Sequence, residues 1–282
     1  LANVGTLDLS GNANALALTA SGTVLYISRS TSADPELYSI DISNPTVSLP
    51  VISSAQIAGS VYGVTMTTDS KLALATGITA SDILLFSPTT LTQIGAYDVT
   101  TSSGSRSVLS LGAYLYLGML TSNPELVVFR GSAGAWESPT IVGSYNTPGT
   151  IDALAVWSNT TRAYLGTANQ AGGGELFIFD ISNPLIPALL GTLEVGASVN
   201  GITVSGNTAY LATAHTSREL TVVNVTNPAS PTIVGGYNTP GAVQAQAVTA
   251  SGTTVYLGTR NNGAGAGREL YAINATVPTL PT

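Results

Sequence analysis

One short phrase, an acidic residue followed by an apolar run, occurs six times along the chain. It begins at Glu36, Asp82, Glu125, Glu175, Glu219 and Glu269, at intervals of 46, 43, 50, 44 and 50 residues. A repeat of this length, filled with short alternating runs, is typical of architectures in which each repeat forms one small four-stranded sheet, or blade. Six repeats in 282 residues leave about 47 residues for each blade. The sequence therefore predicts architecture better than activity, because such frames support binding, scaffolding and catalysis alike.

We predict an all-β fold, a six-bladed β-propeller of four-stranded blades forming one domain over residues 1–282. The fifth repeat shows the pattern most clearly, because runs rich in β-branched residues alternate there with turn signals such as Gly206-Asn207 and Asn227-Pro228. The expected blades cover residues 11–61, 62–104, 105–150, 151–198, 199–242, and 243–282 together with 1–10.

The last repeat stops before its fourth strand, and the missing strand has a counterpart at the other end of the chain. The segment Val4–Leu9 matches Leu190–Val195, which is the expected fourth strand of the fourth repeat. We therefore expect the N-terminal segment to complete the last blade and to close the ring. Such closure removes two open strand edges that would otherwise favour aggregation.

Charged residues make up only 8% of the chain, the net charge is −7 and the pI is near 4.4. A nucleic-acid partner would require a basic stripe, which eight scattered basic residues do not supply. A surface built mainly from hydroxyls and amides, with Lys71 as the single lysine, offers few sites to trypsin-like proteases. The composition favours an extracellular or cell-surface location.

The chain has no cysteine, so disulfides, zinc–thiolate sites and thiol nucleophiles are excluded, and we predict neither a metal nor a cofactor. No run approaches the roughly 20 apolar residues that a membrane-spanning helix needs. The sequence begins at Leu1 without the pattern of a signal peptide, which we interpret as a mature or trimmed start. A signal peptide, an anchor or a pilin-like helix upstream of Leu1 stays open.

The phrases Glu175–Pro184 and Glu219–Pro228 resemble the LVIVD-repeat family of β-propellers. Their common features are an apolar strand, an Asp or Asn at its end and an Asn-Pro turn; the second, third and sixth repeats depart from this pattern. The resemblance implies a bacterial or archaeal protein, secreted or surface-bound, that binds or displays rather than catalyses. It brings no catalytic motif that can be transferred to this chain.

One polar residue stands at the expected start of the innermost strand of each repeat. These residues are Asn14, Tyr62, Arg106, Asp152, Asn200 and Gln244, spaced by 48, 44, 46, 48 and 44 residues. In a closed ring they would converge on the mouth of the central channel, so they form the candidate binding site. The alternative is a lining that only holds ordered water, with Arg106 and Asp152 as a local ion pair.

The six repeated acids are expected on the same side of the blades. As a functional group they would attract a cation or a basic partner. The interpretation that we favour is structural: a carboxylate that recurs in every blade accepts backbone N–H bonds at the turn that enters the third strand.

The loops between the second and third strands vary most and are the expected recognition surface. They contain Arg29, Arg218, Arg260, Arg268 and His215, the last of which we expect to be solvated rather than catalytic. Asp41, Asp180, Asn224 and Asn274 are expected to cap the turn after the third strand. The candidate glycosylation sites are Asn159, Asn224 and Asn274, each in an Asn-x-Ser/Thr triplet.

Three functions fit these observations. The first is a non-enzymatic surface propeller for adhesion or for protein or glycan binding, such as the exposed head of a pilus-like or filament subunit. The second is a hydrolase or lyase acting at the channel mouth, for which the expected ring offers one carboxylate, Asp152. The third is a self-assembling lattice or filament, in which Tyr145 and Tyr237 on the outer strands contact a neighbour.

Overall fold

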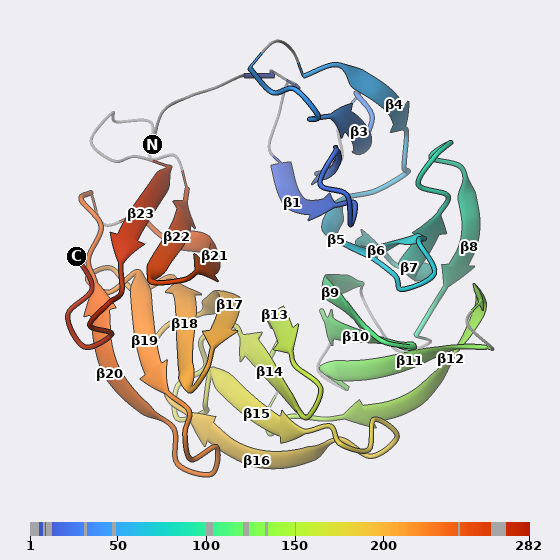
Figure 1. Ribbon diagram of the computed structural model, residues 1–282. Helices are drawn as coiled ribbons and strands as arrows, with labels where there is room; N and C mark the ends of the chain where they lie inside the picture. Colours follow the sequence, from blue (N-terminus) through green and yellow to red (C-terminus); the bar gives the residue numbers. More distant parts are fainter. Residues whose placement is uncertain are drawn as a thin grey trace. The chain divides into compact units, whose positions relative to one another are not determined.

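The computed structural model describes residues 6–7, 9, 13–30, 33–46, 49–99, 104–120, 124–132, 135–149, 151–241, 243–260 and 269–282, without the side chains of 132–138. These residues form antiparallel strands joined by turns (Figure 1). The chain divides into two compact units, Leu1–Asn146 and Thr147–Thr282. Each unit contains three sheets that follow one another along the chain.

The first unit holds three four-stranded blades. Blade one contains β1 (Ala13–Leu18), β2 (Val24–Arg29), β3 (Leu37–Asp41) and β4 (Val51–Ala55); blade two contains β5 (Val61–Met66), β6 (Leu72–Ile78), β7 (Ser81–Phe86) and β8 (Gln93–Tyr97); blade three contains β9 (Ser105–Leu111), β10 (Tyr114–Met119), β11 (Leu126–Ser132) and β12 (Ala135–Tyr145). Within this unit β5 packs between β1 and β9.

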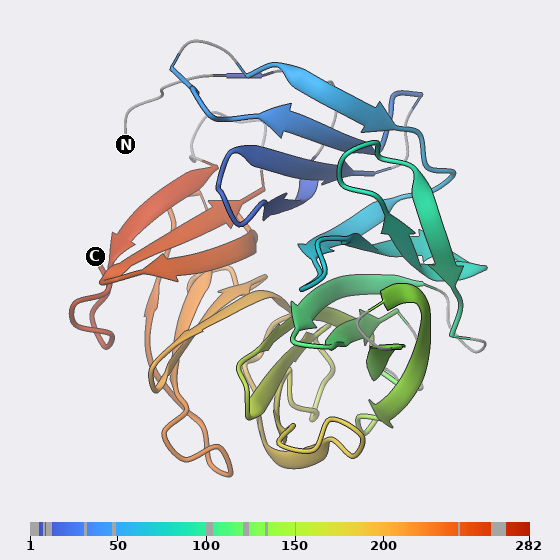
Figure 2. The same ribbon diagram turned by 45° about the vertical axis from the view of Figure 1, so that its right-hand side comes forward.

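The described residues of the second unit form two four-stranded blades and one blade of three strands. Blade four contains β13 (Ala153–Ser158), β14 (Arg162–Thr167), β15 (Leu176–Asp180) and β16 (Ala188–Leu193); blade five contains β17 (Val199–Ser205), β18 (Thr208–Thr213), β19 (Leu220–Asn224) and β20 (Thr232–Tyr237); blade six contains β21 (Ala245–Ser251), β22 (Thr254–Thr259) and β23 (Leu270–Asn274). Within this unit β17 packs between β13 and β21 (Figure 2).

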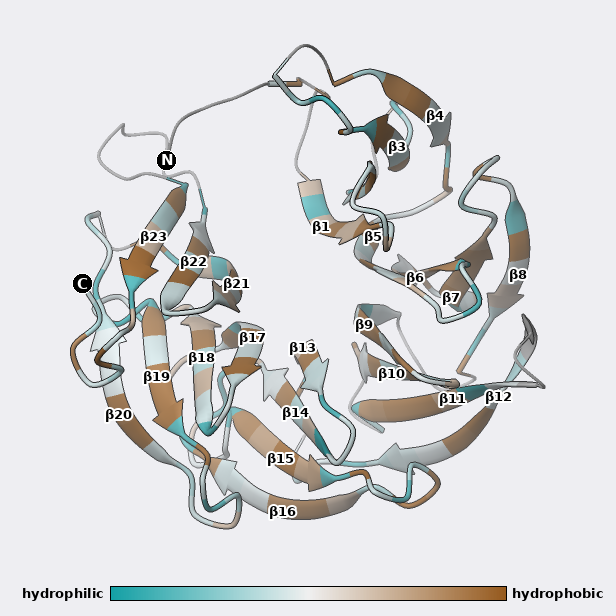
Figure 3. Ribbon diagram, viewed as in Figure 1, coloured by the Kyte–Doolittle hydropathy of each residue, from teal (hydrophilic) through white to brown (hydrophobic). Residues whose placement is uncertain are grey.

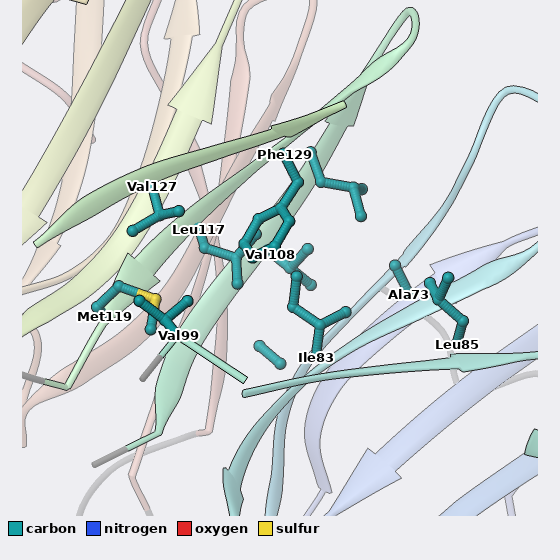
Figure 4. Packing of buried hydrophobic residues seen from close by; sticks show 11 residues of the cluster. Ala73, Ile83, Leu85, Val99, Val108, Leu117, Met119, Val127 and Phe129 are labelled. Atoms are coloured by element: carbon teal, nitrogen blue, oxygen red, sulfur yellow. The ribbon is translucent and has the colours of Figure 1, made fainter. Parts of the chain in front are cut away.

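Neighbouring blades bury their apolar residues against each other. Between blades two and three the core includes Ile83 of β7, Val108 of β9, Leu117 of β10 and Phe129 of β11 (Figure 4). In blades two to five the second and third strands are largely buried, and β15 is apolar along most of its length (Figure 3). This burial is expected, because a small sheet with two apolar faces is stable only when a neighbouring sheet covers each face.

The predicted N-terminal closure lies largely outside the described residues, and of residues 1–10 the structure describes only Thr6, Leu7 and Leu9, outside any strand. At the other end, Thr282 exchanges two backbone hydrogen bonds with Asn274, at 2.6 and 3.0 Å. Thr232 pairs with Asn224 at the matching place in blade five. Thr282 therefore stands where a fourth strand begins, and the closure stays a prediction. No helix that could span a membrane occurs among the described residues.

Candidate functional site

The repeated acids are buried inside the blades. Glu36, Asp82, Glu125, Glu175 and Glu219 have no exposed surface. A buried carboxylate is unfavourable unless strong hydrogen bonds compensate the lost hydration. Four of these acids accept short bonds from backbone N–H groups: Glu36 from Ile57 (2.6 Å), Asp82 from Val99 (2.6 Å), Glu175 from Val195 (2.7 Å) and Glu219 from Thr239 (2.8 Å).

Most of the backbone N–H groups that bind the acids lie in a different part of the blade from the one that the sequence predicts. The sequence predicts the turn that enters the third strand, but the four donors named above lie after the fourth strand, in the link to the next blade. In blade four the predicted loop also contributes, since the Gln170 N–H donates to Glu175 Oε1 at 3.4 Å. The acid therefore ties the end of its own blade to its third strand. Its recurrent position at the start of the third strand fits this geometry, because the side chain reaches the link from there.

The residue that precedes each donor varies between blades. In blade one it is Gln56, whose Nε2 donates to both oxygens of Glu36 at 3.1 Å. In blade four it is Glu194, a second carboxyl within hydrogen-bonding reach of Glu175. Desolvation and the Glu175 charge raise the pKa of Glu194 above its ordinary value of 4.5. In blade one an amide thus donates hydrogen bonds to the buried acid, whereas in blade four a second carboxyl lies beside it.

A β-bulge interrupts the first strand of every blade. The ladder between the first and second strands skips one residue each time, and the skipped residues are Asn14, Tyr62, Arg106, Leu154, Asn200 and Gln246. A bulge leaves one residue without a cross-strand partner and re-aims its side chain. We call these six the bulge residues.

This register corrects the predicted ring at two positions. Asn14, Tyr62, Arg106 and Asn200 are bulge residues, as an equivalent ring requires. Asp152 and Gln244 are not, because each directly precedes its strand, and Leu154 and Gln246 take the bulge positions. A threonine at the end of the second strand would have given the register from the sequence. In four blades this threonine pairs with the residue that precedes the bulge, and these threonines are Thr76, Thr167, Thr213 and Thr259.

Four of the bulge side chains, from blades one, two, three and five, connect neighbouring blades of one unit, whereas that of Gln246 donates to Ala245 O of its own strand at 3.2 Å. Asn14 Nδ2 donates to Val61 O at 2.8 Å, and Asn200 Nδ2 donates to Ala245 O at 2.8 Å. The Arg106 guanidinium lies over the Tyr62 ring, 4.4 Å from its centroid. The Asn bonds are equivalent in the two units, since Val61 and Ala245 each precede the bulge of the following blade. These side chains fasten adjacent blades.

The loop arginines do not form one exposed group. Arg29 ends β2 and is 1% exposed, where its Nη1 donates to Pro35 O and Tyr38 Oη at 3.2 and 3.3 Å. The expectation of a loop residue was therefore wrong for Arg29. Arg218 donates to Val195 O at 3.0 Å and to Thr221 Oγ1 at 3.1 Å, so it links blade five to blade four. Arg268 lies outside the described residues.

A small polar pocket of about 240 Å³ opens where blades four and five meet. It is lined by Asn169 after β14, by Gly196, Ala197 and Ser198 in the link from β16 to β17, and by Ala214, His215 and Thr216 after β18. Sequence reasoning missed Asn169 and Ser198, because three segments far apart in the chain build the pocket. Among the described residues, no group of three or more His, Cys, Asp or Glu side chains is placed to hold a metal ion.

The predicted turn caps are confirmed. The side-chain oxygens of Asp41, Asp180, Asn224 and Asn274 accept the backbone N–H two residues on, at 2.8 to 2.9 Å. The bonds from Ser43 and Ser182 hold the pKa of Asp41 and of Asp180 below the usual range. Asn159 caps its turn in the same way through Thr161 and Arg162. All three sequon asparagines thus use Oδ1 to shape a turn.

Residues 170–195 and 196–239 match the family model described as LVIVD repeat. The chain carries LVIVD repeats. These two matches cover the last two strands of blade four and all four strands of blade five, including the acids Glu175 and Glu219. A search of curated proteins finds no match.

Solved structures resemble the chain over nearly its whole length. A protein from Lactobacillus plantarum aligns with a TM-score of 0.75 at 14% identity, over 95% of this chain and 86% of that one. The Cps50 (Swd1) β-propeller domain of Myceliophteria thermophila aligns at 0.68 and 12%, over 96% and 86%. BamB from Moraxella catarrhalis aligns at 0.58 and 11%, over 90% and 82%. The fold is that of a six-bladed β-propeller, with three described strands in the last blade.

Proposed function

We propose that this LVIVD-repeat propeller is a non-enzymatic binding protein that acts outside the cell and recognises a protein or glycan partner. The observation that carries the proposal is the use of its polar side chains. The buried acids bind backbone N–H groups, and Asn14 and Asn200 join blades. The groups that would suit acid–base chemistry thus serve the frame, which leaves the loops for recognition.

The loops after the second strands have the properties of a recognition surface. The β14–β15 and β18–β19 loops expose Asn169, Thr216 and Ser217 on one end of blades four and five. Hydroxyls and amides there offer hydrogen bonds with little net charge, which suits a glycan or a polar protein surface. The low charge of the whole chain supports the extracellular location.

The proposal includes display on a pilus-like or filament assembly. Leu185 and Ile186, in the turn between β15 and β16, are 48% and 70% exposed. Exposed apolar residues of this size are typical of contact sites. Sedimentation of the protein and of Ile186→Ser tests this form: self-association weakened by the substitution supports it, and a monomer in both cases removes it.

Binding to a glycan array and to immobilised extracellular proteins tests the function. We expect binding that falls at least tenfold in Thr216→Ala/Ser217→Ala and is kept in the control Ser205→Ala/Ser230→Ala, whose residues are exposed elsewhere in blade five. The bound glycans are then incubated with the protein and analysed for cleavage. Release of products, lost on substitution of Arg106 or Asp152, would instead establish the hydrolase or lyase alternative.

A further inference from the structure

We propose that the pocket between blades four and five binds one neutral sugar residue, with Asn169, Ser198 and His215 as its recognition groups. The inference rests on the proposed binding function and assigns the ligand class to one place. The pocket belongs to the second unit, where its lining residues follow the ends of β14 and β18 and precede the start of β17.

The direction of the hydrogen bonds within the pocket is fixed by its neighbours. Ser198 Oγ accepts the backbone N–H of Asn169 at 3.0 Å, so its own proton is free to donate. His215 Nδ1 accepts the backbone N–H of Ser217 at 3.2 Å. The neutral imidazole therefore carries its proton on Nε2, which makes that atom a donor. The Ser198 hydroxyl and His215 Nε2–H are thus two hydrogen-bond donors on residues that line the pocket.

The remaining polar groups are the Asn169 amide and the Thr216 hydroxyl, each of which both donates and accepts. A ligand that satisfies this set needs several oxygen atoms that can act in both senses. Sugar hydroxyls have this property. The methyl groups of Ala197 and Ala214 supply a small apolar surface for the carbon side of a ring.

The charge next to the pocket selects against an anion. Gly196, which lines the pocket, donates its N–H to the buried carboxylate of Glu175 at 3.1 Å, and Glu194 lies beside the same carboxylate. Arg218 is directed to Val195 O and Thr221 Oγ1. A carboxylate ligand would face negative charge close behind the wall of the pocket, whereas a neutral sugar would not.

The volume limits the ligand to about one residue. A pocket of about 240 Å³ is below the range of drug-sized ligand sites, and its lining contains no Phe, Tyr or Trp. We therefore expect a dissociation constant of about 1 mM for a single glycoside. Tight attachment would come from many displayed copies that bind together.

The single histidine of the chain makes the test direct. Protein labelled with ¹⁵N-histidine gives one imidazole signal set, which is followed by NMR during titration with methyl glycosides of galactose, glucose and mannose, with N-acetylglucosamine and with glucuronate, each to ~50 mM. We expect a saturable Nε2 shift with at least one neutral sugar. Asn169→Ala and Ser198→Ala should each weaken it at least fivefold.

Ser205→Ala, at the other end of β17, is the matched control and should leave the titration unchanged. Melting curves of all variants identify any loss of folding, and a variant that fails to fold is replaced by Ser198→Gly or Asn169→Ser. No saturable shift with any neutral sugar, or a shift with glucuronate alone, would overturn the inference. If the protein binds to the glycan array but the histidine signal does not shift in the titration, the proposed function is retained and this pocket is excluded as its site.

Discussion

Blades five and six have nearly the same first three strands but differ greatly in burial. Leu220 of β19 is fully buried, whereas its counterpart Leu270 of β23 is 53% exposed. Glu219 is fully buried and bonded to Thr239, whereas Glu269 is exposed. The sequences at these places are alike, but their neighbours within the second unit differ. A fourth strand, β20, completes blade five, and Leu220 belongs to an apolar cluster that includes residues of β21 and β22 in blade six. The link after β20 supplies the N–H group that Glu219 binds.

Deletion of Leu1–Ser10 should have the largest effect on this comparison. If that segment completes blade six, its loss exposes the edge of β23, and we expect the melting temperature to fall by about 10 °C or the protein to aggregate. Hydrogen exchange should accelerate at Leu270–Ile273 and stay slow at Leu220–Val223. An unchanged melting curve would refute the closure.

Removal of the buried acid should be the next largest effect. Glu219→Ala leaves the Thr239 N–H without its acceptor, and we expect a loss of about 2–3 kcal/mol in the free energy of unfolding. Glu269→Ala should cost a similar amount in the full chain and almost nothing after deletion of residues 1–10. Urea denaturation of the single and combined variants measures this coupling. Equal costs of Glu269→Ala in both backgrounds would contradict it.

Gly235 tests the contact between the two blades. A Cβ at this position would stand 2.5 Å from Pro278 O, in the turn of blade six, just as a Cβ at Gly191 would stand 2.3 Å from Pro228 O in blade five. Because a backbone atom cannot yield easily, Gly235→Ala should cost about 1–3 kcal/mol. Gly258→Ala, with no atom closer than 3.7 Å, is the control in urea denaturation and should cost less than ~1 kcal/mol. Equal costs would show that the turn adapts.

The smallest expected effect concerns the neighbour of the acid. Glu194 has a raised pKa in the folded state, so its contribution to stability is greatest at low pH and is lost as the pH rises from below 4.5 through the folded-state pKa. Glu194→Gln copies Gln56 of blade one and should raise the melting temperature at pH 7 by about 1 °C, since the group is exposed. Gln56→Glu should do the reverse. A lower melting temperature for Glu194→Gln at pH 7 would show that the two carboxyls do not repel.

The blades and their turn caps could be predicted because both depend on local sequence. Alternating runs, Asn-Pro turns and the acid before each third strand recur at regular intervals, and the structure places strands and caps there. The register of the first strand could not be predicted in the same way. Asp152 and Gln244 resemble Asn200 in polarity and lie close to the strand, but a bulge moves the equivalent position by two residues. The polarity of a residue does not show which residue of the first strand is left out of the pairing with the second strand.

The pocket and the burial of Arg29 depended on contacts between distant segments. Arg29 is hidden because Pro35 O and Tyr38 Oη accept its Nη1 protons and the Tyr38 ring lies 5.6 Å from its guanidinium carbon. Its sequence, at the end of a strand before a polar loop, indicated exposure. The pocket required the relative placement of residues 169, 198 and 215, which the repeat pattern alone does not supply.

The bulge in every first strand also affects how such a chain diversifies. Each bulge residue lies outside the ladder, so its side chain can change without breaking a cross-strand pair. The chain already carries amides, a phenol, a guanidinium and an aliphatic group at these six places. The blades therefore carry different functional groups at one equivalent position. Mutagenesis of these six positions would give a small library of variants in which to look for new binding specificities.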